Sequence, residues 1–375
     1  MDSARDRVGC SREAMGSGAT SAGTAAFAQR LAGAAAEGHF RRALGLTLSS
    51  IGLGTYLGRD DDATDRSYRE AIEAAVAGGV NVLDTAVSYR LQRSERAVGA
   101  ALGALAARGF TRDHVVVSTK AGYVPAADAA AYFQREIVAR GLAGPGDLVA
   151  GCHSLAPGYL AHQIETSLGN LGLRTIDVFY LHNPEEQLDE VPPDLFLGRV
   201  RSAFERLERE VADGRLTVYG TATWNGYRVR PGRPEWLSLE TLVHMAQEVA
   251  GNAHHFAVVQ LPFSLAMPEA LVAPTQTLGR TPVSLLTAAR ELGITVLCSA
   301  SLMQGRLARG LPPQARAAIA GLETDGQRAL QVARSAPGIT TALVGMSRTA
   351  HVRENLALVG RPPLSPDAVT ALLQG

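Results

Sequence analysis

The hydrophobic residues of this chain follow two patterns that alternate along it. Segments such as 65–79 carry apolar residues three and four positions apart, whereas segments such as 115–120 are short apolar runs. The first pattern predicts an amphipathic helix, and the second predicts a strand that is buried on both faces. Most of the helical segments end at glycine, which is a common helix terminator. The pattern therefore predicts helices and strands that alternate.

This alternation yields eight predicted strands. They are residues 50–54, 80–84, 115–120, 176–182, 216–222, 256–261, 294–300 and 339–345. Because helices connect successive strands, the sheet is expected to be parallel, and eight such units predict an α/β fold of the (β/α)₈ TIM-barrel class. A doubly wound sheet is the alternative. It usually carries the phosphate-binding pattern GxGxxG after its first strand, and in the segment GLGTYLG (52–58) the third glycine comes one residue late.

The chain is expected to form one domain with an N-terminal extension. Residues 1–38 are rich in Ala, Gly and Ser and lack a periodic apolar stripe, so they are predicted to be a disordered or loosely helical tail. Residues 39–375 are predicted to form the barrel. Two connections, 121–156 and 261–280, are long for a compact domain, and long connections often carry function. Both follow strands, so both are expected to overhang the carboxyl ends of the barrel strands.

Composition narrows the class of partner. The chain has 36 basic and 36 acidic residues and a formal net charge of zero, so neither nucleic acid nor an anionic membrane surface is an expected partner. No apolar run is long enough to cross a bilayer, and the first ten residues do not resemble a signal peptide. Three widely spaced cysteines suit neither a disulfide framework nor a zinc site. We therefore expect a cytoplasmic protein with a small neutral ligand; its oligomeric state stays open.

Lys120 is the only lysine in the chain, since the other 35 basic residues are arginine. It ends a predicted buried strand, where a compact ammonium of adjustable pKa differs most from a planar, permanently charged guanidinium. Asp84 and His182 end two other predicted strands, and Gln260 is the last residue but one of a third. In a barrel the carboxyl ends of the strands meet at one face, which carries the active site. The sequence therefore predicts that these side chains converge.

Tyr89 lies five residues after Asp84, so its phenol is expected to face the same space and to carry a proton. An ammonium about 4 Å away would lower the phenol pKa by up to about 3, while burial would oppose that change. The sequence therefore predicts a tyrosine with a lowered pKa.

Three segments resemble the aldo-keto reductase family. DTAVSYRLQRSERAVGAAL (84–102) is similar to the signature DTAxxYxxxxSE, VVVSTK (115–120) to the third-strand lysine segment, and IDVFYLHNPE (176–185) to the fourth-strand segment. The resemblance extends from about residue 40 to residue 358. It implies a (β/α)₈ barrel that uses NADPH to reduce an aldehyde or ketone. By this resemblance Tyr89 is the general acid, Lys120 and Asp84 tune it, and His182 orients the carbonyl.

The resemblance also implies a set of cofactor contacts. These are Thr55, Tyr56 and Gln260 at strand ends, Ser347 and Arg348 near the 2′-phosphate, and Glu354 and Asn355 near the adenine. The chain departs from the family pattern where Ala222 and Thr223 replace Ser-Asn, where Ser299 replaces a tyrosine that stacks on nicotinamide, and at His351. Thr223 and Ser299 remain candidate contacts, with Asn225 as partial compensation.

Other polar and aromatic residues have less definite roles. Tyr123, Trp224 and Phe263 follow strand ends, so they are candidate substrate contacts or covers of the barrel mouth. His153, in the first long connection, is expected to be a solvated or capping residue. No His spacing indicates a metal site. Two alternative functions stay open: a cofactor-binding, redox-sensing or regulatory barrel with little turnover, and a non-redox lyase or isomerase that uses the same Tyr and Lys.

Overall fold

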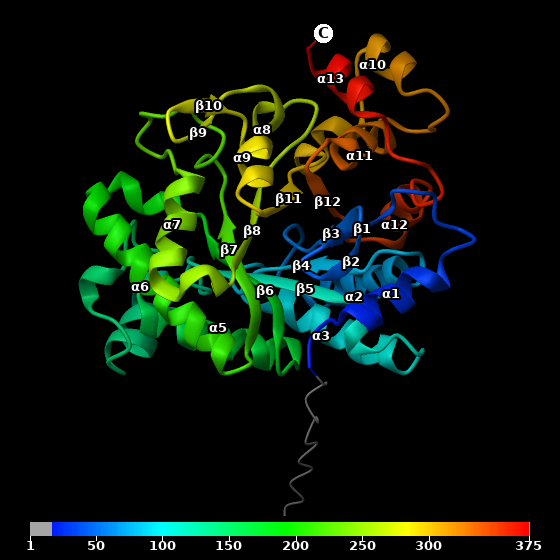
Figure 1. Cartoon of the computed structure of the whole chain (residues 1–375). Helices are drawn as coiled ribbons and strands as arrows, with labels where there is room; N and C mark the ends of the chain where they lie inside the picture. The colour runs from blue at the N-terminus through cyan, green and yellow to red at the C-terminus, as the bar shows by residue number, and fades with distance from the viewer. Residues whose placement is uncertain (1–16, 375) are drawn as a thin grey trace, which may run out of the picture.

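Eight parallel strands close into a barrel in the computed structural model, which describes residues 17–374 (Figure 1). Their order around the barrel is β11-β12-β3-β4-β5-β6-β7-β8. Their bounds are Ile51–Gly54 (β3), Val82–Asp84 (β4), Val116–Ala121 (β5), Ile176–His182 (β6), Leu216–Ala222 (β7), Phe256–Pro262 (β8), Thr295–Ser299 (β11) and Ile339–Gly345 (β12). Each lies within or next to a predicted segment, so the barrel prediction is confirmed.

Helices cover the outside of the barrel and bury their apolar faces against it. They are Asp62–Ala77 (α2), Arg93–Ala106 (α3), Pro157–Leu171 (α5), Pro193–Ala212 (α6), Leu239–Ala250 (α7), Leu285–Glu291 (α9), Asp325–Ser335 (α11) and Thr349–Leu356 (α12). Side-chain caps start several of them; for example, Asp61 accepts a hydrogen bond from the Thr64 amide at 2.8 Å. Gly172 ends α5 in the left-handed conformation. Local signals therefore set the helix limits, and burial of one face fixes each helix on the barrel.

The N-terminal segment requires a correction. Residues 21–30, predicted to be part of a disordered or loosely helical tail, form an ordered helix (α1, Ser21–Arg30), and the strands Phe40–Ala43 (β1) and Leu46–Ser49 (β2) form a hairpin after it. The fully buried ring of Phe27 packs edge-on against Phe40 at 6.0 Å. One aromatic anchor and the Thr20 cap order a helix that lacks a continuous apolar stripe. Residues 1–16 of the predicted tail lie outside the described residues.

Both long connections contain structure of their own. The first includes Ala129–Tyr132 (α4) and a helical turn, Phe133–Val138, whose Phe133 and Ile137 are buried. The second includes Glu269–Val272 (α8) and Gln276–Leu278 (β9), which pairs with Thr281–Val283 (β10). After this hairpin, α9 begins at residue 285, where Ser284 caps it. The helices Pro313–Ala318 (α10) and Pro366–Gln374 (α13) complete the upper side in Figure 1.

Candidate active site

Asp84 joins three strands at the carboxyl end of the barrel. Its Oδ2 accepts a hydrogen bond from Lys120 Nζ at 2.6 Å, and its Oδ1 accepts from Ser118 Oγ at 2.7 Å and from Gln260 Nε2 at 2.9 Å. Asp84 ends β4, and Gln260 lies on β8, four strands away around the closed barrel. The last bond therefore crosses the barrel interior. Since a carboxylate only accepts, the bond also fixes the amide orientation of Gln260.

Lys120 is 1% exposed and is held by two acceptors. Besides Asp84, its Nζ donates to the Thr85 carbonyl at 2.9 Å, and it lies 5.1 Å from the centre of the Tyr89 ring. Burial lowers the pKa of Lys120, and the adjacent Asp84 carboxylate opposes that change. A primary ammonium suits this narrow arrangement because it is a point charge with three donors, whereas a guanidinium is a planar group with five.

Tyr89 is positioned by a turn with an unusual backbone. The next three residues, Arg90, Leu91 and Gln92, all have positive φ values, of 51°, 52° and 72°. For residues other than glycine this conformation costs on the order of 1–3 kcal/mol each and tends to occur at functional sites. The buried Arg90 guanidinium anchors the turn through Asp65 at 2.5 Å. A rigid turn therefore sets where the phenol lies.

The direction of the Tyr89 pKa is opposite to that predicted from sequence. Burial raises the pKa of Tyr89 well above its usual value, and the negative charge of Asp84 adds to the effect. The ammonium of Lys120 lies 5.1 Å from the centre of the ring and directs its hydrogen bonds to Asp84 and Thr85. The prediction of a lowered pKa was therefore wrong, and the phenol is protonated throughout the neutral range.

A row of aromatic rings surrounds this phenol. The ring of Tyr89 meets Tyr56 at 5.0 Å and His182 at 5.7 Å, and His182 meets Tyr123 at 5.1 Å, each edge to face. Burial lowers the pKa of His182 well below its usual value, so the imidazole is neutral. Its Nδ1 is buried without a hydrogen-bond partner among the described residues. An unpaired buried nitrogen of this kind is suited to a bound ligand or water.

His153, which was expected to be a solvated or capping residue, is fully buried. Arg199 donates to Gln187 Oε1 at 2.7 Å, so the Gln187 amide nitrogen donates to His153 Nδ1 at 3.2 Å. His153 Nε2 therefore carries the proton that it donates to the His182 carbonyl at 2.7 Å. Burial lowers the pKa of His153 to about 4, which keeps it in this neutral form. The chain of bonds ties the first long connection to the end of β6.

The other residues that were predicted to contact cofactor or substrate at the strand ends differ in how much of their surface is exposed. Tyr56 and Trp224 are 56% and 44% exposed, whereas Thr55 and Phe263 have no exposed surface. Thr55 Oγ1 donates to the Asp84 carbonyl at 3.1 Å, so it fastens β3 to β4. Phe263 is part of the hydrophobic core and exposes no surface at the barrel mouth. Thr223 is buried, and its hydroxyl has no hydrogen-bond partner among the described residues.

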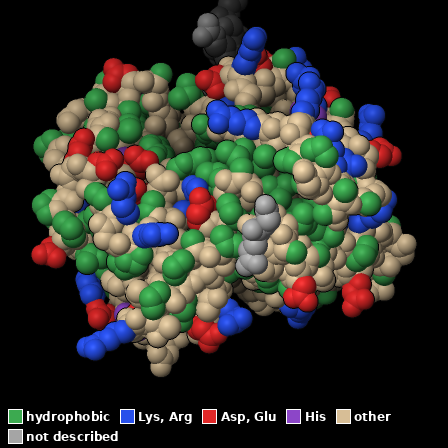
Figure 2. All heavy atoms as spheres, turned by 90° about the horizontal axis from the view of Figure 1, so that it is seen from above, with side chains coloured by type: hydrophobic (Ala, Val, Ile, Leu, Met, Phe, Trp, Pro, Cys, Tyr) green, Lys and Arg blue, Asp and Glu red, His purple; other side chains and the backbone are tan. Residues whose placement is uncertain are grey.

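Two more of the predicted site residues, Tyr123 and Ser299, take part in hydrogen bonds. Asn183 Nδ2 donates to the Tyr123 hydroxyl at 3.1 Å, and the Ser299 carbonyl accepts from the Phe263 amide at 3.0 Å. Seen from above, hydrophobic side chains extend across the middle of the molecular surface, with arginine and acidic side chains around them (Figure 2). The described surface on this side is therefore apolar at its centre and charged toward its edge.

The candidate adenosine-binding residues gather at helix α12. Arg348 is exposed and precedes the first residue of the helix without a side-chain cap, and the Ser347 carbonyl accepts from Ser67 Oγ at 2.6 Å. Glu354 accepts from Thr324 Oγ1 at 2.5 Å, which ties α12 to the start of α11. Asn355 is buried. The free amides of a helix N-terminus beside an arginine form a suitable anion site.

Glu185 is a buried group that the sequence analysis missed. It follows Pro184 in the 3-10 helix Pro184–Asp189 (η4) and is 4% exposed. Its Oε1 accepts hydrogen bonds from the amides of three consecutive residues after β7: Trp224 at 2.6 Å, Asn225 at 3.0 Å and Gly226 at 3.1 Å. Its only signal in the sequence is an acidic residue three positions after a strand end, because the amides come from a segment about forty residues away.

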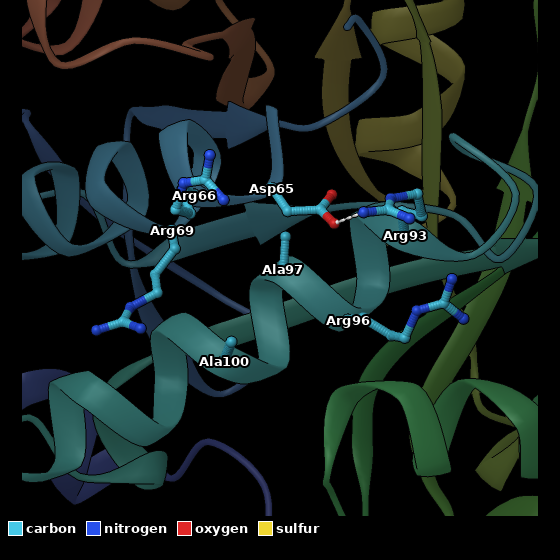
Figure 3. A pocket seen from close by; sticks show the side chains of 7 residues that line it. All are labelled: Asp65, Arg66, Arg69, Arg93, Arg96, Ala97 and Ala100. Atoms are coloured by element: carbon cyan, nitrogen blue, oxygen red, sulfur yellow. Dashed lines mark ion pairs between the residues drawn. The ribbon is translucent and has the colours of Figure 1, made fainter. Parts of the chain in front are cut away.

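A surface pocket of about 330 Å³ lies apart from this site, between α2 and α3. Asp65 pairs with Arg93 within it, while Arg66, Arg69 and Arg96 point away from one another (Figure 3). It contains none of the strand-end side chains, so we assign the chemistry to the barrel mouth. Among residues 17–374, no group of three or more His, Cys, Asp or Glu is arranged to hold a metal ion, and no helix could span a membrane.

The comparisons with known sequences identify a family. The sequence model described as the Aldo/keto reductase family matches residues 50–316. An NADH-specific methylglyoxal reductase from Escherichia coli (strain K12) is 27% identical over 190 residues, which cover 49% of this chain and 51% of the relative. A D-threo-aldose 1-dehydrogenase from a Pseudomonas species is 33% identical over 187 residues, covering 50% and 51%. The chain thus spans about half the length of the curated relatives it matches.

Solved structures share the fold. An aldo/keto reductase from Klebsiella pneumoniae, in complex with NADP and acetate, aligns with a TM-score of 0.60 at 21% identity, covering 90% of this chain and 95% of its own. The holo form of an aldo-keto reductase from Bacillus halodurans aligns with a TM-score of 0.61 at 20% identity, covering 89% and 95%. At such identities the similarity supports the barrel fold alone.

Proposed function

The chain belongs to the aldo/keto reductase family, and on that premise we propose that it is an NADPH-dependent oxidoreductase that reduces an aldehyde or ketone to an alcohol. The observation that carries the proposal is the buried ion pair of Lys120 and Asp84, at 2.6 Å, beside the ring of Tyr89. A buried charge pair at the strand ends contributes little to stability for the cost of its desolvation, so a chemical role is the better explanation for it.

The proposed mechanism assigns one task to each side chain. Tyr89, which stays protonated because burial raises its pKa, donates its proton to the carbonyl oxygen as negative charge develops there. The ammonium of Lys120 lies beside the phenol and stabilises the charge left on it, and Asp84 holds that ammonium in place. The neutral imidazole of His182, edge to face with Tyr89, offers the carbonyl oxygen a hydrogen bond.

The residues at the strand ends fit a nicotinamide cofactor. When bound, the cofactor supplies the hydride. The buried hydroxyl of Thr223, which has no hydrogen-bond partner in the described part of the chain, is a candidate partner for the carboxamide, in place of the amide side chain that the family pattern leads one to expect. Gln260 is a second candidate partner, since its amide nitrogen is committed to Asp84 and its oxygen is left to accept. Tyr56, Ser299, Glu354 and Asn355 remain proposed cofactor contacts, and Tyr123 and Trp224 remain proposed substrate contacts.

Arg348 provides a test of cofactor preference. The Arg348→Ala protein should bind NADPH roughly tenfold more weakly, because it loses a charge-assisted hydrogen bond to the 2′-phosphate. Its affinity for NADH, which lacks that phosphate, should change little. Both dissociation constants can be measured by titration of the purified protein. Arg353→Ala, an exposed arginine on the same helix, is the control; an equal loss for both cofactors would contradict the assignment.

The direct test of the proposed function is turnover of a panel of carbonyls with NADPH, followed by the absorbance of the reduced cofactor. The panel should include methylglyoxal, an aldose, aromatic aldehydes and a quinone. Reduction of at least one compound with formation of its alcohol is expected. Tight NADPH binding with no oxidation by any compound would favour the regulatory barrel, and conversion without nicotinamide would favour the lyase or isomerase. The cytoplasmic location stays a prediction.

A further inference from the structure

The loop after β7 is held by a carboxylate from a different element. Oε1 of Glu185 accepts hydrogen bonds from the backbone amides of Trp224, Asn225 and Gly226. Its other oxygen, Oε2, is buried without a hydrogen-bond partner among the described residues. Three successive amides that converge on one oxygen fix the backbone direction directly after Thr223. The loop therefore has its conformation set by a side chain, not only by its own turns.

No positive group neutralises Glu185 within the described part of the chain. None of the ion pairs there includes it, and Arg228 of the loop donates to the Trp224 carbonyl and pairs with Glu269 of α8 at 3.1 Å. Two titratable groups near it are Tyr123 after β5 and Tyr227 of the loop. The charge of Glu185 contributes to the raised pKa of both tyrosines. The amides are thus its principal stabilisation.

We propose that Glu185 is a positioning residue whose carboxylate clamps the β7–α7 loop and thereby places Thr223 and Trp224 at the mouth of the barrel. Where it concerns ligands, the inference rests on the proposed function: Thr223 is the candidate carboxamide partner and Trp224 a candidate substrate contact. The clamp itself is a property of the chain and does not depend on that function.

The clamp responds to pH near neutrality. Burial raises the pKa of Glu185 from 4.5 to about 7, although the three amides act in the opposite direction. Above pH 7 the ionised carboxylate makes charge-assisted bonds and holds the loop firmly; below it the protonated acid holds the loop weakly. Stability follows the opposite course. The folded state binds this proton more tightly than the unfolded state does. The stabilisation that the protonated Glu185 gives the folded state is therefore lost as pH rises from about 4.5 through about 7.

The two tryptophans of the chain, Trp224 and Trp236, both lie in this loop, so fluorescence reports on it without any need for activity. In the Trp236→Phe protein, Trp224 is the only tryptophan that fluoresces. Its backbone amide donates a hydrogen bond to Glu185, so its emission reports on the clamp. We expect its emission to change with a midpoint near pH 7. Adding Glu185→Gln, which keeps the shape but not the charge, should abolish this transition and leave the emission at pH 8 close to that of the single variant at pH 6.

Two further readouts separate positioning from simple structural support. Glu185→Gln should raise KM for cofactor or carbonyl roughly tenfold at pH 8, as expected for the loss of charge-assisted bonds, with a smaller change in kcat. The Tm of the unsubstituted protein relative to that of Glu185→Gln should fall between pH 6 and pH 8. A residue needed only for stability would instead lower Tm and activity together, in proportion.

Asp189→Asn is the matched control, since it removes the same charge from an exposed position on the same turn. It should keep the fluorescence transition. A transition that persists in Glu185→Gln, or that is absent from the Trp236→Phe protein, would overturn the proposal. If no carbonyl is turned over but the transition behaves as expected, the proposed function fails and the clamp stands. If a carbonyl is turned over but no transition depends on Glu185, the proposed function stands and the clamp fails.

Discussion

Replacing Lys120 with methionine is expected to reduce the rate of carbonyl reduction by about a thousandfold or more, within the range that acid-base groups supply. Methionine approximates the length of the lysine stem but removes the ammonium that lies 5.1 Å from the Tyr89 ring. The negative charge that develops on the phenol then loses the positive charge beside its ring. Single-turnover measurements at saturating NADPH would report the chemical step, and binding titrations should show that most cofactor affinity remains.

The Lys120→Met protein is also expected to be less stable, so a control is needed that restores stability without the ammonium. Breaking a buried ion pair leaves an uncompensated charge, which costs about 3–5 kcal/mol, and Asp84 is almost fully buried. The double variant Lys120→Met/Asp84→Asn removes both charges and still offers an acceptor to Ser118 and Gln260. It should recover much of the lost Tm but none of the lost rate. Recovery of rate together with stability would show that Lys120 acts only through the fold.

Lys120→Arg should be nearly as inactive, although it keeps the positive charge. Within residues 17–374 the site offers Nζ only two hydrogen-bond acceptors, Asp84 Oδ2 and the Thr85 carbonyl, in an enclosed space. A guanidinium is larger and brings five donors, so it would have to displace its neighbours or leave donors unpaired. Activity close to that of the unsubstituted protein would contradict the claim that a point charge is required.

Most of the architecture was predictable because its signals are local. Runs such as 176–182 are continuously apolar, and the helices between them carry one apolar face, so strand number and order followed from the pattern. The strand-end rule then predicted that Asp84, Lys120 and Gln260 meet, and in the structure they are linked by hydrogen bonds. The hydrogen bond from Gln260 to Asp84 across the barrel could not be predicted. It depends on the register between the strands, which the sequence does not reveal.

The features missed depend on contacts between distant segments. The pKa of Tyr89 was predicted to fall because a nearby ammonium was easier to infer from sequence than the depth of burial, which has the larger effect. Glu185 resembles an ordinary acidic residue of a polar turn until the loop after β7 folds over it. Helix α1 lacks a periodic stripe, and its order rests on Phe27, whose partner Phe40 follows in the hairpin. In each case the energy comes from a partner that local periodicity does not reveal.

Replacing Tyr89 with phenylalanine should cause the other large loss, again about a thousandfold or more in the chemical step. The substitution removes one oxygen and keeps the ring that packs between Tyr56 and His182, so the fold and the cofactor affinity should be almost unchanged. Tyr132→Phe removes a hydroxyl from the first long connection, away from the strand ends, and should leave the rate unaffected.

The pH dependence of this pair gives the sharper test. Since burial raises the pKa of Tyr89 and lowers that of His182, neither group changes its protonation near neutrality. The single-turnover rate of the unsubstituted protein should therefore be flat from about pH 6 to pH 9, with any limb near pH 7 due to Glu185 and absent from Glu185→Gln. The residual rate of Tyr89→Phe should instead rise as pH falls, because solvent must then supply the proton. A residual rate that is independent of pH and close to that of the unsubstituted protein would assign the proton to another group, for which His182, with its ring 5.7 Å from that of Tyr89, is the candidate.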